Sequence, residues 1–319
     1  MRSVGIMVLF PPVSQDMVGY RTYNPSYYQI TENMSRCQMP HRISFVVRPR
    51  EAIDIPWSEG YQLYSAILNV MLGCDEAASR RAHDSPLSSI SLRPLHGNFR
   101  RSQRAKHKVA DPANRYDFHI GITDPKEAEI FRAIVQPLVL REQDIMLEKG
   151  ALMVEEATSN TRSFEELLMD AGRVACPFVE FEFVSPACIQ YKNTKVSEMF
   201  PHREAVFSSL LAKWNAVCPE ELKMSLERDE MARYLMEEPL SYETHSAMVN
   251  TVFDKTKGHP RPILKQGFQG RCRYIFAKNA PKDVRNAVLA LAGFAEYSGV
   301  GSAVARGCGA VRVKMEVVK

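Results

Sequence analysis

The residues with the clearest chemical potential lie near the C-terminus, in segment 299–309, which reads G-V-G-S-A-V-A-R-G-C-G. Two Gly-apolar-Gly triplets flank five residues that carry one cation, Arg306. Glycine permits positive φ and lets a large partner approach the backbone amides. A guanidinium adds a planar, permanently charged donor group that suits phosphate. The segment predicts a site for a phosphate-bearing partner, with contacts from Gly299, Gly301, Arg306, Gly307 and Gly309.

Two other interpretations of this glycine-rich loop (residues 299–309) can be compared with the sequence. A dinucleotide-binding fingerprint needs a glycine at its sixth position and a following helix. Val304 occupies that position, and the ten residues after Gly309 have the pattern of a strand, which excludes this interpretation. A tight turn from helix to strand, without a ligand, stays compatible with the glycine content.

Histidine is the side chain best suited to proton transfer near neutral pH, because its unperturbed pKa is about 6.5. His83 stands out, since it ends the first predicted helical region and precedes a strand, where a side chain can face a cleft. His96 and His107 border a basic stretch and are reserve candidates. His119 lies in an apolar strand pattern and is expected to be structural. The other histidines are His41, His202, His245 and His259.

Basic residues are concentrated in two stretches although the net charge is only +4. Seven Lys and Arg lie between positions 93 and 115 against a single acid, and seven more lie between 255 and 278 without any acid. Acids collect instead in 220–238, a predicted solvated helical segment. Two acid-poor stretches indicate a localised track for a polyanion. Its candidate residues are Lys265, Arg271, Arg273, Arg100, Arg101, Lys106 and Lys108.

The composition is that of a globular protein of 319 residues, with 45% apolar and 24% charged residues. No apolar run approaches the about 18 residues of a membrane-spanning helix, so no membrane partner is expected. Seven scattered cysteines without a C-x-x-C pair fit a reducing cytoplasm. The sequence also lacks metal-binding and nucleotide-binding motifs, so we expect neither a metal nor a cofactor.

The predicted elements occur twice in the order strand, helix, strand, strand, helix, strand. This order indicates an α+β fold of two tandem ferredoxin-like domains with antiparallel sheets. We place the first domain at 39–172 and the second at 173–319, and expect residues 1–38 to be a flexible extension. The predicted strands are 42–47, 88–95, 116–122, 145–157, 178–184, 244–253, 263–276 and 310–317, and the main helices are 58–71, 124–138, 202–215 and 284–297.

The glycine-rich loop resembles, at every position, the signature of the repeat-associated RNA-binding superfamily, and in particular of the CRISPR repeat-processing endoribonucleases of the Cas6 type. Lesser motifs follow in the family's order: the histidine-bearing segment 81–86, Ser185-Pro186, Trp214-Asn215 and the Gly-Phe-x-Gly stretch 267–270. The likeness covers about residues 39–318.

This resemblance implies a metal-independent endoribonuclease that cuts CRISPR precursor RNA within its repeats. The 2′-hydroxyl would attack the adjacent phosphorus, leaving a 2′,3′-cyclic phosphate and a 5′-hydroxyl, and His83 would match the family's acid/base histidine. The family's tyrosine position falls on Leu68 here and its lysine position on Ser88 or Ser89. Helpers would therefore come from Tyr61, Tyr64 or Lys106.

The implied partner is CRISPR repeat RNA, and the resemblance leaves open other Cas effector subunits and a second copy of the chain. The alternative is a non-catalytic subunit that binds guide RNA in an effector complex, because such a protein shares the fold and the loop. A generic RNA-recognition module is disfavoured, since its aromatic strand motif is missing from the sequence.

Overall fold

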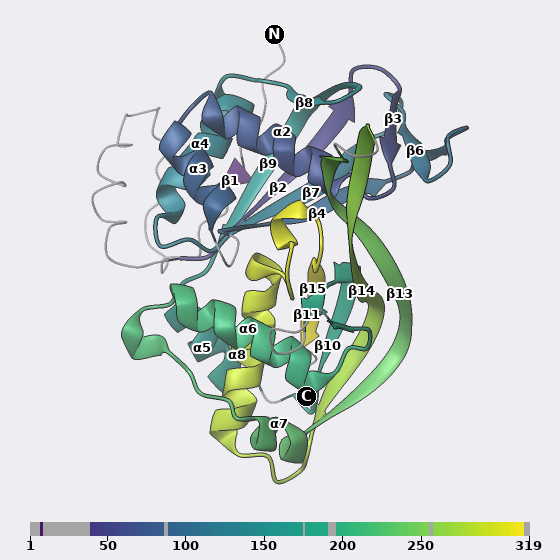
Figure 1. Ribbon diagram of the computed structural model, residues 1–319. Helices are drawn as coiled ribbons and strands as arrows, with labels where there is room; N and C mark the ends of the chain where they lie inside the picture. Colours follow the sequence, from purple (N-terminus) through teal and green to yellow (C-terminus); the bar gives the residue numbers. More distant parts are fainter. Residues whose placement is uncertain are drawn as a thin grey trace, which may run out of the picture.

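The computed structural model describes residues 7–8, 39–85, 89–174, 176–190, 196–254 and 258–315 (Figure 1). Two lobes lie one above the other in this view, each with an antiparallel sheet and helices packed on one face. The expected N-terminal extension lies outside the described residues except for β1 (Met7–Val8), which pairs in parallel with β9 at the edge of the first sheet.

The first domain has the ferredoxin-like strand order. Its sheet runs β9-β2-β7-β4, so the four strands of the repeat stand in the order 4-1-3-2. Helices α2, α3 and α4 cover one face, and α4 continues into a π-helical turn, Gln136–Leu140. The bounds are β2 His41–Pro49, α2 Gly60–Leu72, α3 Glu76–Asp84, β4 Ile90–Gly97, β7 Tyr116–Ile122, α4 Glu127–Val135, β8 Ile145–Leu147 and β9 Gly150–Thr161.

Alternation along the strands explains which face the helices cover. In β2, Ile43, Phe45 and Val47 are buried in the first core, whereas the residues between them are less buried and face the other side. At the start of α3, the Asp75 carboxylate accepts a hydrogen bond from the Ala78 amide at 3.0 Å, which is the expected N-cap. The first sheet therefore has one polar face that the helices of its own domain leave uncovered.

The basic stretch between β4 and β7, for which the sequence analysis predicted no strand, contributes two strands to a small three-stranded sheet. Its strands are β3 (Ile53–Pro56), β5 (Arg100–Arg101) and β6 (His107–Ala110), in the order β3-β6-β5. Buried Glu59, just before α2, forms an ion pair with Lys108 of β6 at 3.0 Å. This pair ties the small sheet to the beginning of α2.

The second domain repeats the plan. Its sheet runs β13-β14-β10-β15, again in the order 4-1-3-2 from the β15 edge, which confirms the predicted tandem ferredoxin-like fold. The larger elements are α5 Phe164–Arg173, β10 Phe178–Ala187, α6 Arg203–Val217, α7 Arg228–Tyr234, β13 Leu235–Asp254, β14 His259–Phe276, α8 Lys282–Ser298 and β15 Val311–Met315; short ones are β11 Ile189–Gln190, β12 Ser197–Glu198 and the 3₁₀ turns Glu220–Leu222 and Val304–Arg306. The helix α5, which ends our predicted first domain, buries its apolar side chains in the second core.

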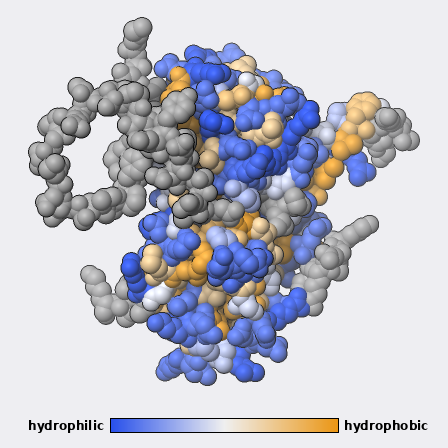
Figure 2. All heavy atoms as spheres, turned by 90° about the vertical axis from the view of Figure 1, so that its left-hand side faces the viewer, coloured by the Kyte–Doolittle hydropathy of each residue, from blue (hydrophilic) through white to orange (hydrophobic). Residues whose placement is uncertain are grey.

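β13 and β14 form a long hairpin that reaches well beyond the sheet (Figure 1). The acidic segment expected to be helical becomes strand from Leu235 onward, so that prediction holds only for α7. Toward its end the hairpin exposes Val252, Phe253 and Leu264, and Figure 2 shows an apolar strip on this projection.

The C-terminal end of α8 joins the two domains. It lies on the polar face of the first sheet, where the Tyr297 hydroxyl donates to Asn160 at 2.7 Å and the Tyr297 carbonyl accepts from Ser91 Oγ at 2.6 Å. Arg42 donates to Glu296 at 2.8 Å. Gly121 permits this approach, because a Cβ there would collide with the Tyr297 carbonyl.

Candidate nucleic-acid interface

The glycine-rich loop is a compact turn in which each of its four glycines has positive φ. The φ values are 62° for Gly299, 81° for Gly301, 88° for Gly307 and 66° for Gly309. Side chains other than glycine seldom adopt this region. At Gly309 an added Cβ would also collide with the carbonyl of Val300. The spacing of the glycines is therefore required by the backbone path.

The glycine amides do not face a partner, in contrast to our prediction. The Gly299 amide donates to the Ala295 carbonyl at 2.9 Å, and the Gly301 amide donates to Ser209 Oγ at 3.0 Å. The Gly307 amide donates to the Val304 carbonyl at 3.2 Å, and the Gly309 amide donates to the Pro186 carbonyl at 2.9 Å. A donor that is already satisfied has no free N–H for phosphate. The glycines shape the loop, and its partly exposed positions are 301–303 and Arg306.

The loop crosses from the second domain into the first. A Cβ on Gly307 would come within 2.9 Å of the Cα of Gly60, at the start of α2, and Ala305 is buried in the core of the first domain. The close approach of Gly60 and Gly307 places Arg306 beside the first turn of α2. A cation from the C-terminal domain thereby reaches the helix that the sequence analysis singled out for Tyr61 and Tyr64.

Tyr64 is buried in α2 and feels the charges of Arg306 and Asp84. Burial raises the pKa of the Tyr64 phenol, the charge of Arg306 opposes this shift, and Asp84 adds to it. Both charges must therefore lie close to Tyr64, which is 6% exposed. Asp84 is the neighbour of His83, whose Nδ1 lies 2.9 Å from the Asp84 carboxylate.

His83 is open to solvent at the C-terminal end of α3, with 58% of its side chain exposed. His96 lies elsewhere, at the end of β4, where its Nδ1 is 3.2 Å from Asp117. His107 is on β6, and its Nδ1 contacts the Ala105 carbonyl at 2.8 Å. Of these three histidines, His83 is the one whose neighbour shares an electrostatic environment with Arg306.

The predicted basic track divides into separate groups. Lys265 donates to Ser302 Oγ at 2.8 Å and so lies against the glycine-rich loop. Arg271 and Arg273 both bind Glu180 on the face of the second sheet without helices. The other predicted cations lie on the small sheet: Arg100 pairs with Asp111, Lys108 with Glu59, Lys106 has a φ of 59° in the turn before β6, and Arg101 is exposed.

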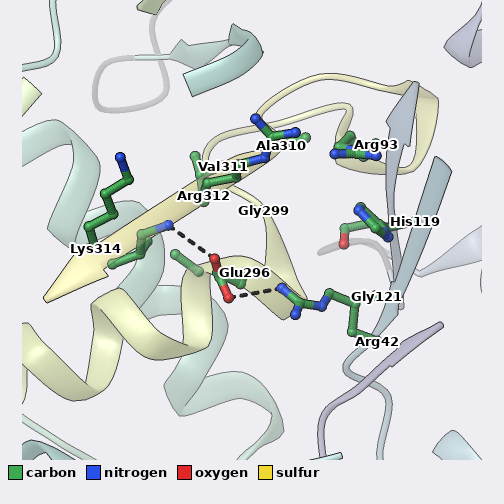
Figure 3. A pocket seen from close by; sticks show the side chains of 13 residues that line it. Arg42, Arg93, His119, Gly121, Glu296, Gly299, Ala310, Val311, Arg312 and Lys314 are labelled. Carbon is green, nitrogen blue, oxygen red and sulfur yellow. Dashed lines mark hydrogen bonds and ion pairs between the residues drawn. The ribbon is translucent and has the colours of Figure 1, made fainter. Parts of the chain in front are cut away.

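The sequence analysis missed a basic cleft between the domains (Figure 3). It has a volume of about 360 Å³ and brings together side chains from β2, β4, β7 and β15: Arg42, Arg93, His119, Arg312 and Lys314. A second cleft of about 600 Å³ shares Arg93 and Arg312 with the first. It continues past His96 to Tyr242 and Arg271.

Positive charge in the first cleft is only partly neutralised. Arg93 pairs with Asp117, yet its Nε is buried without a partner among the described residues. Burial, together with the charges of Arg312 and Arg42, lowers the pKa of Arg93 to about 10. Burial and the same arginines lower the pKa of His119 to about 3. An anion in this cleft would relieve the repulsion among these groups.

The cleft residues come from four strands that are separated in the sequence, which explains why sequence reasoning missed the cleft. The available signal was the strand alternation, because Arg42 and Arg93 occupy positions out of phase with the buried apolar residues of their strands. Among the described residues, no group of three or more His, Cys, Asp or Glu side chains could hold a metal ion, and no helix is long and apolar enough to cross a membrane.

Comparisons with known proteins agree with this geometry. The sequence model of the family described as CRISPR-associated endoribonuclease Cas6 matches residues 181–311. No curated protein sequence matches the chain. Among solved structures, a Cas6 product complex from Thermus thermophilus has a TM-score of 0.60 at 15% identity, with 87% of this chain and 100% of that chain covered.

Two further solved structures have the same fold. A Cas6-related protein from Pyrococcus furiosus has a TM-score of 0.57 at 13% identity and covers 87% of this chain and 99% of its own. A RAMP protein described as binding different RNA substrates has a TM-score of 0.57 at 15% identity, with 86% and 99% covered.

With its two 4-1-3-2 sheets and the glycine-rich loop between α8 and β15, the chain has the fold of a solved RAMP protein. Residues 181–311 match the sequence model of the Cas6 family, and the two domains have the fold of the solved Cas6 structures. The resemblance stated from the sequence is confirmed.

Proposed function

We propose that the protein is an endoribonuclease that cuts CRISPR precursor RNA within its repeats and needs no metal ion. The observation that supports this best is the position of the glycine-rich loop, which brings Arg306 of the second domain to Tyr64 of the first, close to the end of α3. We take His83, Tyr64 and Arg306 to surround the place where an RNA phosphate binds.

RNA supplies its own nucleophile in this reaction. The 2′-hydroxyl attacks the adjacent phosphorus, the bond to the 5′-oxygen breaks, and the products are a 2′,3′-cyclic phosphate and a 5′-hydroxyl. An imidazole at His83 serves the proton transfers, either from the 2′-hydroxyl or to the leaving oxygen. Arg306 balances the charge that develops on the phosphorane. Tyr64, protonated because burial raises its pKa, supports that charge as a neutral donor.

Binding draws on a wider surface than cleavage. Lys265 lies beside the loop, and the basic cleft around Arg93 and Arg312 lies between the two sheets. Phosphate contacts supply much of the affinity in complexes of this kind, whereas bases are read by stacking and hydrogen bonds. The clefts suit a single strand, since an unpaired backbone can follow a narrow charged path between domains.

The test is incubation of the full-length protein with its cognate repeat RNA in the presence of a chelator. We expect cleavage to persist, and to stop when a 2′-deoxynucleotide replaces the residue before the cut. His83→Ala should lower the single-turnover cleavage rate by about 10²- to 10⁴-fold, the range for a general acid or base. Its RNA affinity should stay close to that of the wild type.

Two histidine variants serve as controls. His96→Ala tests the reserve candidate in the second cleft, and His202→Ala changes a histidine at the start of α6. Both should cleave normally. If His83→Ala cleaves at the normal rate, His83 is not the catalytic group. If the wild type binds repeat RNA tightly but never cleaves it, the protein is instead a non-catalytic guide-RNA subunit.

A further inference from the structure

A lysine is completely enclosed behind the glycine-rich loop. Lys213 lies on α6 and is 7% exposed, and its Nζ donates to the carbonyls of Ser298 and Gly299, at 3.1 and 2.9 Å. Among the described residues, its hydrogen bonds are with these two carbonyls and none is with a carboxylate. A buried amine without a counter-ion is costly, and a methionine of similar length would fill the same space without that cost.

One turn earlier on the same helix, Ser209 contacts the other side of the same triplet. Its Oγ accepts a hydrogen bond from the Gly301 amide at 3.0 Å. Positions four apart share one face of a helix, so α6 presents an acceptor and a donor together. Ser209 and Lys213 thus fix the triplet Gly299–Gly301 from both directions, the serine at an N–H and the lysine at a C=O.

The fixed triplet is connected to Arg306 by short contacts within the loop. The Val300 amide donates to the Gly309 carbonyl at 2.8 Å, which joins the two triplets. The Arg306 amide donates to the Ala303 carbonyl at 2.9 Å, and a Cβ on Gly299 would lie 3.0 Å from the Val304 side chain. A shift of the first triplet would therefore be passed to the turn that carries Arg306.

We propose that Ser209 and Lys213 are positioning residues, which set the glycine-rich loop so that Arg306 meets the RNA phosphate. This inference rests on the proposed function, because it assumes that Arg306 binds RNA. Neither side chain touches the RNA itself. The helix α6 thereby raises RNA affinity by holding the loop, although α6 makes no contact with the RNA.

Burial of Lys213 provides a way to separate this role from a structural one. Burial lowers the pKa of Lys213 to about 7, so near neutral pH the folded state carries an unfavourable buried amine. A side chain kept for stability alone would lower the melting temperature when removed. Lys213→Met should instead leave the melting temperature unchanged or raise it, while RNA binding weakens.

The experiment measures hydrogen exchange of the loop amides, melting temperature and repeat-RNA affinity in the full-length chain. We expect Lys213→Met to speed exchange of the amides in 299–309 and to weaken RNA binding about tenfold, and Ser209→Ala to do both to a smaller extent. The control for Lys213→Met is Lys282→Met, at the end of α8 that lies far from the loop. The control for Ser209→Ala is Ser208→Ala, one residue earlier on α6. Both controls should match the wild type in loop exchange and RNA affinity.

Combination with Arg306→Ala completes the test. If Lys213 acts through Arg306, Lys213→Met will cause no further loss of RNA affinity in the Arg306→Ala background. Equal losses in both backgrounds, or unchanged loop exchange in Lys213→Met, would overturn the inference while leaving the proposed function intact. If Arg306→Ala alone binds RNA normally, the proposed role of the loop fails, and the positioning role fails with it.

Discussion

Arg306 is the cation on which the proposed site depends most. It is half-buried in a turn whose flanking residues are enclosed, so the backbone that carries its guanidinium is fixed. A cation whose backbone is fixed before binding loses less entropy when it meets a phosphate. The planar donor group of arginine also binds phosphate with a defined geometry that a lysine cannot reproduce.

Arg306→Ala should therefore weaken repeat-RNA binding about tenfold at moderate salt. A lost phosphate contact lowers the slope of log affinity against log salt by about one. A titration across a salt series measures both quantities. Arg173→Ala is the matched control, because Arg173 is 74% exposed at the end of α5 and makes only a long contact to Asp170. Affinity that is the same for Arg306→Ala and the control at every salt concentration would contradict this prediction.

The glycine-rich loop shows what sequence can and cannot reveal about a single element. The glycine spacing predicted the loop between the last helix and the last strand, and the structure has it there. The glycine spacing could not reveal that the amides already have acceptors within the protein. Two of these acceptors, Ser209 and Pro186, are distant in sequence from Gly301 and Gly309. The motif therefore records a backbone path, and a ligand can be inferred only from the side chains that this path positions.

A substitution that tests this backbone path is Gly309→Ala. The residue has φ of 66°, and an added Cβ would collide with the Val300 carbonyl. A residue other than glycine in this region costs about 1–3 kcal/mol before any clash is counted. We expect the free energy of unfolding to fall by at least that amount in denaturant titrations.

Gly172→Ala is the matched control for Gly309→Ala. Gly172 lies within α5, and a Cβ there would meet no atom nearer than 3.9 Å. Alanine is favoured over glycine in a helix by up to about 1 kcal/mol, so this variant should be more stable than the wild type. Gly309→Ala with unchanged stability would show that the loop can adopt another backbone path.

Strand patterns in the body of each sheet were predictable, and the hairpin was predicted at 244–253 and 263–276 but not over the first residues of β13. Tyr116–Ile122 was predicted with its observed bounds, because an interior strand packed on helices alternates clearly between buried and exposed positions. Residues 236–243 of β13 lie at the sheet edge and are mostly exposed, so no core imposes a period on them. The glutamates and Pro239 of β13 are tolerated at an edge, where the ladder shifts register.

At the scale of the whole molecule, the two sheets enclose a basic cleft that neither domain has alone. Arg42 and Arg93 come from the first domain and Arg312 from the second, and Glu296 binds Arg42 across the boundary. Long stretches of sequence separate the residues of the first domain from Arg312. Only the docking of α8 and β15 on the polar face of the first sheet brings them together, so no local pattern could have predicted the cleft.

Repulsion in this cleft predicts opposite effects on stability and on RNA binding. Arg312 lies opposite Arg93, whose pKa is lowered to about 10 by burial and by the charges of Arg312 and Arg42. Arg312→Gln removes one of the repelling charges, so the melting temperature without RNA should stay the same or rise. The same change removes a phosphate partner, so RNA affinity should fall several-fold and the salt slope by about one.

Arg173→Gln controls for the loss of one positive charge far from the cleft. The melting temperature measured with and without repeat RNA gives the second readout. A ligand that binds only the folded state raises the melting temperature, and a tighter ligand raises it more. For Arg312→Gln this rise should be smaller than for the wild type and the control. If Arg312→Gln instead lowers the melting temperature without RNA and binds RNA normally, Arg312 stabilises the second sheet through Glu182, and the cleft is not a path for RNA.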